Sequence, residues 1–263
     1  MNAKKADKIA TGVLYAIAGV ITLILASLIL YILGRGLPHI SWSFLTTPSK
    51  SFQAGGGIGI QLFNSFYLLI ITMLISIPIS LGAGIYLSEY AKKNFFTNAI
   101  RTAIEVLSSL PSVVVGLFGF LIFVIQAGLG FSIISGALAL TFFNLPLLTR
   151  NVEESLKAVH YTQREAGLAL GLSRWETVTR VVIPEALPGI LTGVILGAGR
   201  IFGEAAALIY TAGQSAPALD FTNWNPLSIS SPLNIFRQAE TLAVHIWKIN
   251  SEGNMPDGPQ VSA

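Results

Sequence analysis

Arg200 and Glu204 are the two charged residues of an otherwise apolar stretch, 187–212. A charged side chain inside a membrane is costly and usually faces a bundle interior or a watery cavity. Because the two residues are four apart, they are expected to form an ion pair on one helix face. Two interpretations of the pair stay open: Arg200 lines a path for an anion, or the pair holds helices together.

Three glycines precede this pair at intervals of four residues, at Gly189, Gly193 and Gly197. With about 100° of rotation per residue, they are predicted to share a helix face with Arg200 and Glu204. Glycines at this spacing let a second helix approach closely. The sequence therefore predicts a helix-packing surface that ends in two charges.

The longest charged passage away from the termini is 162–188, between two apolar stretches. The segments 162–165 and 173–176 both have the Ser/Thr-x-x-Glu pattern of a capping box, which begins a helix. Gly171 stands where the first helix needs a left-handed residue, and Pro184 is expected to end the second. Two short helices around a glycine corner suit a docking element. An ordinary loop with two helical turns would carry the same signals.

The same passage resembles the EAA loop of ABC-importer permeases, E-A-A-x₃-G-x₉-I-x-L-P. Glu165, Ala166 and Gly167 occupy the E-A-A positions, with Gly167 in place of the second alanine. Gly171 and Pro184 follow at the family's spacing. In that family the loop docks on a cytoplasmic ATPase subunit, so the resemblance implies the same role for these five residues.

Composition indicates a polytopic membrane protein of the all-α class. Hydrophobic residues make up 52% of the chain and charged residues only 11%, whereas soluble proteins contain about 25% charged residues. The absence of cysteine excludes a disulfide framework and a thiolate metal site. The three histidines are scattered, so no metal site is expected, and no long basic cluster points to nucleic acid. Glu153 and Glu154 are expected to be solvated.

Apolar runs predict five membrane spans in a single transmembrane domain, 1–263, since about 20 apolar residues cross a bilayer. Pro78 is expected to kink the second span, and Gly82 with Ala83 to allow close helix contact there. A cytoplasmic loop at 151–186 and an external loop and tail at 213–263 connect or follow the spans. The predicted spans are 9–34, 61–88, 104–126, 131–150 and 187–212.

The distribution of basic residues predicts that the N-terminus is cytoplasmic, because lysine and arginine are enriched in cytoplasmic loops. The external segments then hold four basic residues, at 35, 50, 237 and 248. The internal segments hold eleven, at 4, 5, 8, 92, 93, 101, 150, 157, 164, 174 and 180. This orientation places the 162–188 passage in the cytoplasm.

Beyond the loop, nearly the whole chain resembles the PstA-type permease subunits of phosphate ABC importers. The main similarity is at 188–208, where the family's G-R-x-x-G-E-T-A-A-L reads G-R-I-F-G-E-A-A-A-L, with Ala205 replacing threonine. Segments 84–91, 110–119 and 145–150 add to it. The resemblance implies a MetI-like helical bundle in a bacterial or archaeal plasma membrane that transports phosphate and neither hydrolyses ATP nor binds a cofactor. It also implies a heterodimer with a homologous permease, two copies of a cytoplasmic ATP-binding subunit and an extracytoplasmic phosphate-binding protein.

Several alternatives remain at this point. The family pattern implies a sixth span, so either the sequence is truncated or its C-terminus lies outside. No residue by itself separates phosphate from sulfate, molybdate or phosphonate. A non-transport membrane scaffold or receptor could use the same helices, but it would not need a docking loop with the EAA spacing.

Overall fold

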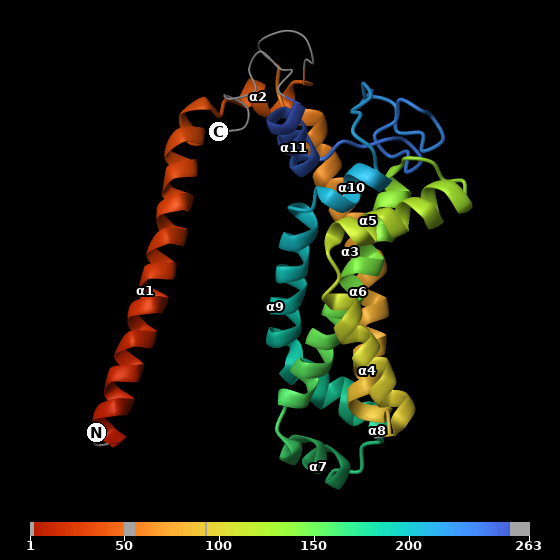
Figure 1. The fold of residues 1–263 in the computed structure, drawn as a ribbon. Helices are drawn as coiled ribbons and strands as arrows, with labels where there is room; N and C mark the ends of the chain where they lie inside the picture. The colour runs from red at the N-terminus through yellow and green to blue at the C-terminus, as the bar shows by residue number, and fades with distance from the viewer. Residues whose placement is uncertain (1–2, 50–55, 93, 253–263) are drawn as a thin grey trace.

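The computed structural model describes residues 3–49, 56–92 and 94–252, and this part of the chain is helical with connecting loops (Figure 1). Four helical segments are long and apolar enough to cross a membrane: Asp7–His39, Gly59–Tyr90, Ile133–Ala158 and Arg174–Phe202. A bent helix pair makes a fifth candidate span. The prediction of an all-α polytopic membrane protein is confirmed. Lys50, Lys93 and the tail 253–263 of the predicted topology lie outside the described residues.

Helix α1 (Ala3–Gly36) stands apart from the other helices (Figure 1). Its apolar side chains are exposed all around the helix, and none of its span window is buried. A helix that is apolar on every side suits a lipid environment. A short turn, η1 (Leu37–His39), and helix α2 (Trp42–Thr46) follow it.

The centre of the bundle is the packing of α3 (Gly59–Ile85) against α6 (Ile133–Ala158). Pro78 lies inside α3 without ending it. A Cβ on Gly84 would lie 2.7 Å from Cβ of Val152, whereas a Cβ on Gly82 would meet nothing within 4 Å. The close approach is therefore made at Gly84, and the prediction that Gly82 allows it is wrong.

The predicted third span, 104–126, is not one straight helix. Helix α4 (Phe95–Ser108) is followed by α5 (Ser112–Gly119) and a π-helical turn, η3 (Phe120–Gln126), and the two parts meet at 101°. Pro111 lies at the break in an extended conformation. Proline disfavours a helical conformation in the residue before it, which accounts for the break.

The predicted cytoplasmic loop 151–186 is mostly helical. Helix α6 runs on to Ala158, and α7 (Tyr161–Ala169) and α8 (Arg174–Thr177) follow. From α8 the chain continues through a π-helical turn, η4 (Val178–Val182), into α9 (Ile183–Phe202). This 29-residue helix is about 44 Å long at about 1.5 Å per residue, so it extends well beyond a hydrocarbon core of about 30 Å.

The prediction that Pro184 ends a helix is therefore wrong. The amide of Ile183 donates to the carbonyl of Val178, five residues back, which is the wider spacing of a π-turn. Pro184 then falls in the first turn of α9. A proline inside a continuous helix leaves a carbonyl of the preceding turn without its donor, and a π-turn is one of the local adjustments that accommodate this.

The fifth predicted span, 187–212, is also interrupted. Helix α9 ends at Phe202, and a separate short helix, α10 (Ala206–Thr211), begins after a three-residue break at 203–205. A loop leads from α10 to the last helix, α11 (Leu242–Glu252). Helices α10 and α11 lie at one end of the molecule, and α7 and α8 at the other (Figure 1).

Candidate functional site

The first helix of the loop between α6 and α9 begins two residues earlier than predicted. Helix α7 is capped by His160, whose side chain accepts a hydrogen bond from the amide of Thr162. The predicted capping box at 162–165 is therefore wrong, because Thr162 already lies inside the helix. The second box is confirmed: the Ser173 hydroxyl accepts from the amide of Glu176, whose carboxylate accepts from the amide of Ser173.

Gly171 turns the chain between α7 and α8. Its φ is +80°, the left-handed conformation that the sequence predicted. The amide of Leu172 donates to the carbonyl of Gly167, and the amide of Gly171 donates to that of Leu168. This pair of bonds is the Schellman motif, which satisfies the last carbonyls of a helix. The direction of α8 relative to α7 is therefore fixed by backbone bonds.

Gly167 brings α7 against α8. A Cβ at this position would lie 2.7 Å from Cγ2 of Thr177, so the second alanine of E-A-A would not fit here without a shift. Glu165 and Ala166 lie on the exposed side of the same helix. The departure of Gly167 from the family's pattern therefore has a packing reason.

The outer side of this loop combines exposed apolar side chains with a free carboxylate. Glu165 has no ion-pair partner among the described residues. Leu170 is 82% exposed and Trp175 is 59% exposed. Beside them, a groove of about 330 Å³ between α7 and η4 is lined by Glu165 and by the exposed side chains of Tyr161 and Leu168. Exposed apolar groups around a groove are typical of protein interaction sites.

Two ion pairs that the sequence did not predict lie at this end of the molecule, and the first of them holds the loop to the bundle. Arg164 binds Glu89, at the end of α3, with both groups largely buried and Nη2 2.7 Å from Oε1. Arg101 of α4 binds Glu153 of α6 at 2.8 Å. Glu153 is only 6% exposed, so the expectation that it is solvated is wrong, whereas Glu154 is exposed.

Arg200 and Glu204 do not pair with each other in the described part of the chain, so this prediction is wrong. The guanidinium carbon of Arg200 lies 3.9 Å from the centre of the Phe143 ring on α6. The Glu204 carboxylate accepts a hydrogen bond from the amide of Ala207, at the start of α10, at 3.2 Å. Because α9 ends at Phe202, Arg200 and Glu204 are not on the same helix, and their separation of four residues does not place them one helical turn apart.

The three glycines of α9 meet polar side chains of α6. A Cβ on Gly189 would lie 2.7 Å from the Ser155 hydroxyl, and one on Gly197 would lie 3.2 Å from the Asn144 amide. A Cβ on Gly193 would overlap the Asn151 side chain. The glycine face therefore allows α9 to approach α6 closely, with small polar groups in contact.

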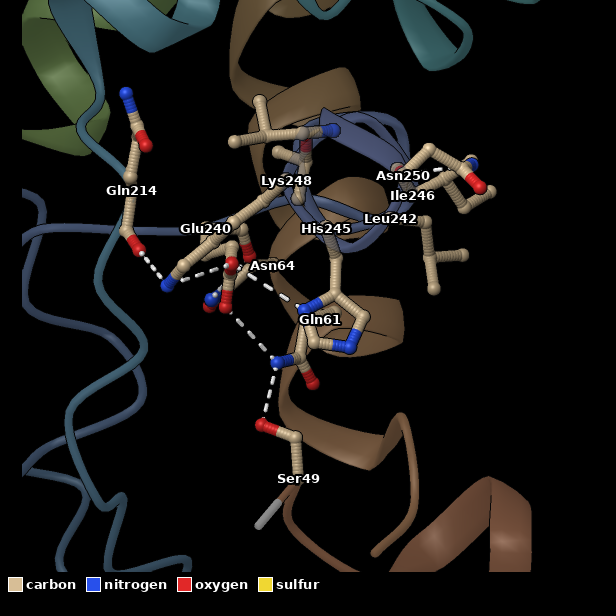
Figure 2. Close-up of polar contacts among 12 residues, drawn as sticks. Ser49, Gln61, Asn64, Gln214, Glu240, Leu242, His245, Ile246, Lys248 and Asn250 are labelled. Carbon is tan, nitrogen blue, oxygen red and sulfur yellow. Dashed lines mark hydrogen bonds and ion pairs between the residues drawn. The ribbon is translucent and has the colours of Figure 1, made fainter. Parts of the chain in front are cut away.

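A buried polar cluster, missed in the sequence, surrounds Glu240 (Figure 2), near α11 at the end of the molecule opposite to α7 and α8 (Figure 1). Glu240 accepts a hydrogen bond from the Gln61 amide at 3.0 Å and lies 3.2 Å from His245 and 3.6 Å from Lys248. Asn64, on the same side of α3 as Gln61, donates to the Glu240 carbonyl. The signal for this cluster was two amide side chains, three residues apart, at the start of an apolar helix.

The pKa values of two buried groups of this cluster, Glu240 and Arg237, depart from their usual range. Burial by itself raises the pKa of Glu240, but His245, Gln61 and Lys248 together hold it below its usual range. Burial lowers the pKa of Arg237 to about 10, and its guanidinium donates to the Asn64 side chain at 2.8 Å. The segment that leads into α11 is thus fastened to α3 by ionic and amide groups.

Comparison with known proteins agrees with these features. The sequence pattern of the family described as "Binding-protein-dependent transport system inner membrane component" matches residues 76–231, which include the α7–α8 loop and Arg200. The chain is 55% identical over 262 residues to the "Probable ABC transporter permease protein YqgI" of Bacillus subtilis, covering all of this chain and 89% of that protein.

Two further relatives are phosphate transport system permease proteins PstA. The one from Xylella fastidiosa is 36% identical over 181 residues, 69% of this chain. The one from Haemophilus influenzae is 35% identical over 191 residues, 73% of this chain. The chain spans 63% of the length of the first and 66% of the second. This chain belongs to the family of binding-protein-dependent transport system inner membrane components, the multi-pass membrane permeases of ABC transporters.

Proposed function

We propose that this chain is the permease subunit of an ATP-driven importer that carries inorganic phosphate into the cell. The α7–α8 loop docks on a cytoplasmic ATPase subunit, which hydrolyses the ATP. A homologous permease completes the membrane channel, and an extracytoplasmic binding protein delivers phosphate. In this arrangement two copies of the ATPase serve the two permeases.

The geometry of the α7–α8 loop is the observation that carries the ATPase docking. Its two helices are set by a Schellman corner and a capping box rather than by the membrane. The exposed Leu170 and Trp175 supply apolar contact area, and Glu165 supplies a carboxylate without an internal partner. A rigid, protruding and partly apolar element of this kind suits a partner's groove.

The similarity to the phosphate permeases supports phosphate as the substrate, together with Arg200. A guanidinium stays charged at any physiological pH and binds tetrahedral oxyanions through two N–H groups. Sulfate, molybdate and phosphonate are the alternative substrates, since the name of the Bacillus subtilis relative specifies none. Membership of the permease family weighs against a non-transport scaffold.

The decisive test is uptake by the complete complex in vesicles. The chain is co-expressed with the partner permease and the ATPase subunit, purified and reconstituted with the binding protein. We expect ATP-dependent uptake of labelled phosphate that an excess of sulfate, molybdate or phosphonate does not suppress. Uptake of another oxyanion in place of phosphate would show that the proposed substrate is wrong.

Gly171→Val is expected to weaken ATPase association and uptake. Valine in the left-handed conformation costs about 1–2 kcal/mol or more, and no atom lies within 4 Å of a Cβ at this position, so the effect is on the backbone alone. Gly171→Asn is the control, since asparagine tolerates this conformation. Co-purification of the ATPase with each variant measures the effect. Equal ATPase recovery for valine and glycine would contradict the docking role of this corner.

The proposed orientation places the N-terminus and the α7–α8 loop in the cytoplasm. Because the chain contains no cysteine, single cysteines can report on each side. Leu170→Cys and Leu227→Cys are matched sites, 82% and 86% exposed. An impermeant thiol reagent on intact cells is expected to label position 227 and to reach position 170 only after permeabilisation. The opposite pattern would reverse the orientation.

A further inference from the structure

Glu89 is the carboxylate that joins α3 to the α7–α8 loop. It lies in the π-helical turn η2 (Tyr86–Tyr90), which continues α3 at the loop end of the bundle. Arg164 of α7 binds it through two nitrogens, Nη2 to Oε1 at 2.7 Å and Nε to Oε2 at 3.3 Å. Arg174 of α8 donates to its backbone carbonyl and lies over the ring of Tyr90. Both short helices of the loop therefore contact the same turn.

Arg164 also reaches a third element. Its Nη2 donates to the carbonyl of Leu156 and its Nη1 to that of Val159, both at 2.7 Å, at the end of α6. The Leu156 carbonyl also accepts from the amide of Val159, the C-cap residue of α6. One guanidinium thus links the ends of α3 and α6 to the first turn of α7.

This ion pair is more buried than the Arg150–Glu154 pair, whereas the carboxylate of the Arg101–Glu153 pair is buried to a similar extent. The side chains of Arg164 and Glu89 are 17% and 9% exposed, whereas those of Arg150 and Glu154 are 47% and 63% exposed. A buried pair stabilises a fold little, because desolvation offsets its attraction. What a bidentate pair does supply is a defined geometry between the two groups.

We propose that the Glu89–Arg164 pair is a rigid joint through which α3 and the α7–α8 loop move together during the ATP cycle. The two residues are positioning residues for transport: they hold the docking helix in register with the membrane helix and contact neither ATP nor the transported ion. This inference rests on the proposed ATPase docking. Two π-turns contact the loop or continue it: η2 lies at the end of α3, where Arg164 binds Glu89, and η4 follows α8 in the chain. Such turns occur frequently at functional sites, which fits this role.

Distance measurements on the complete complex test the joint directly. Spin labels are placed on cysteines introduced at Ile79 on α3 and Gln163 on α7, which are both exposed and lie outside the docking residues Leu170 and Trp175. With the joint intact, we expect a narrow distance distribution that is the same with and without ATP. A distance that changes with ATP in this otherwise unmodified chain would overturn the proposal.

Two matched double variants replace both residues of an ion pair with methionine, one at the buried Glu89–Arg164 pair and one at the exposed Arg150–Glu154 pair. Glu89→Met/Arg164→Met leaves no buried charge unpaired, so the fold is expected to survive. We expect the distribution of its Ile79–Gln163 distance to broaden and its phosphate uptake per ATP hydrolysed to fall about tenfold, within the range of coupling between sites. Arg150→Met/Glu154→Met, the exposed control, is expected to match the unmodified complex in both measurements. Unmodified behaviour of the Glu89→Met/Arg164→Met complex would also overturn the proposal.

The unmodified complex separates this inference from the proposed function. Failure of the ATPase to co-purify with it would count against the docking, and failure to take up phosphate would count against the substrate. The distance between the two labels depends on neither substrate identity nor uptake. Arg164→Lys is a further test, because lysine keeps the positive charge but cannot form the bidentate hydrogen bonds of the guanidinium. Its phosphate uptake per ATP hydrolysed is expected to lie between that of the unmodified complex and that of Glu89→Met/Arg164→Met.

Discussion

Gly84→Leu is expected to prevent the chain from folding into a stable bundle. A Cβ here would lie 2.7 Å from Cβ of Val152, and 3.2 Å from the backbone nitrogen of Glu153. Valine is stiff at χ1 and backbone cannot rotate away, so α3 and α6 would have to separate. Overpacking a close interface costs about 1–3 kcal/mol and occasionally more, and we expect the upper end here.

Gly82→Leu is the matched control, two residues along the same helix. Nothing lies within 4 Å of a Cβ at that position, so the larger side chain would point away from α6. Thermal unfolding of both variants in detergent, followed by size-exclusion chromatography, gives the comparison. Equal stability of the two variants would mean that α3 and α6 are not packed closely at Gly84.

Features with a local signal could be predicted from the sequence. The apolar runs predicted the helical class, and the predicted spans 9–34, 61–88 and 131–150 each overlap a helix long and apolar enough to cross a membrane, because such a helix needs a continuous apolar stretch. Gly171 and the Ser173–Glu176 box were predicted because helix ends depend on a few neighbouring residues. The spacing of Gly189, Gly193 and Gly197 similarly indicated a close helix contact.

Features that depend on distant residues could not be predicted in this way. Glu89 and Arg164 are 75 positions apart, so no local pattern connects them. The buried cluster around Glu240 joins residues 179 positions apart. Buried groups of this kind are recognised only when the fold brings their partners together.

Whether a proline or a glycine ends a helix depends on the surrounding structure as well as on the residue. Pro184 was predicted to end a helix, yet the preceding π-turn lets the helix continue through it. Gly203, which caps α9, lies inside an apolar run that hydropathy assigns to one span. Hydropathy measures the free energy of transfer to lipid and does not report whether a helix is continuous. The break at 203–205, which separates Arg200 from Glu204, therefore could not be predicted from it.

That break changes what is expected of Arg200. An ion pair between Arg200 and Glu204 would predict loss of the complex on removing either partner, because the other would remain buried and unpaired. In the structure each charge has its own contact: Arg200 lies over Phe143, and Glu204 accepts from the amide of Ala207. Removing Arg200 therefore leaves the interaction of Glu204 intact.

Arg200→Ala is thus expected to keep assembly of the complex and to lose phosphate uptake. Hydrogen bonds to charged groups contribute about 1.5–3 kcal/mol, which corresponds to a loss of roughly 10- to 100-fold if Arg200 binds the passing oxyanion. Arg200→Lys keeps a cation near Phe143 but loses the bidentate fork, so partial uptake is expected. Complex yield and uptake by reconstituted vesicles are measured on the same preparations.

Arg150→Ala serves as the control for a missing arginine. This residue is exposed at the loop end of α6 and pairs only with exposed carboxylates, so full uptake is expected. Glu204→Gln keeps a carbonyl oxygen for the Ala207 amide, so the start of α10 should persist in that variant. If Arg200→Ala lowers uptake only in proportion to complex yield, Arg200 holds α9 against Phe143 and takes no part in conduction. Uptake lost at full yield, with Arg150→Ala unaffected, would place the guanidinium on the path of the anion.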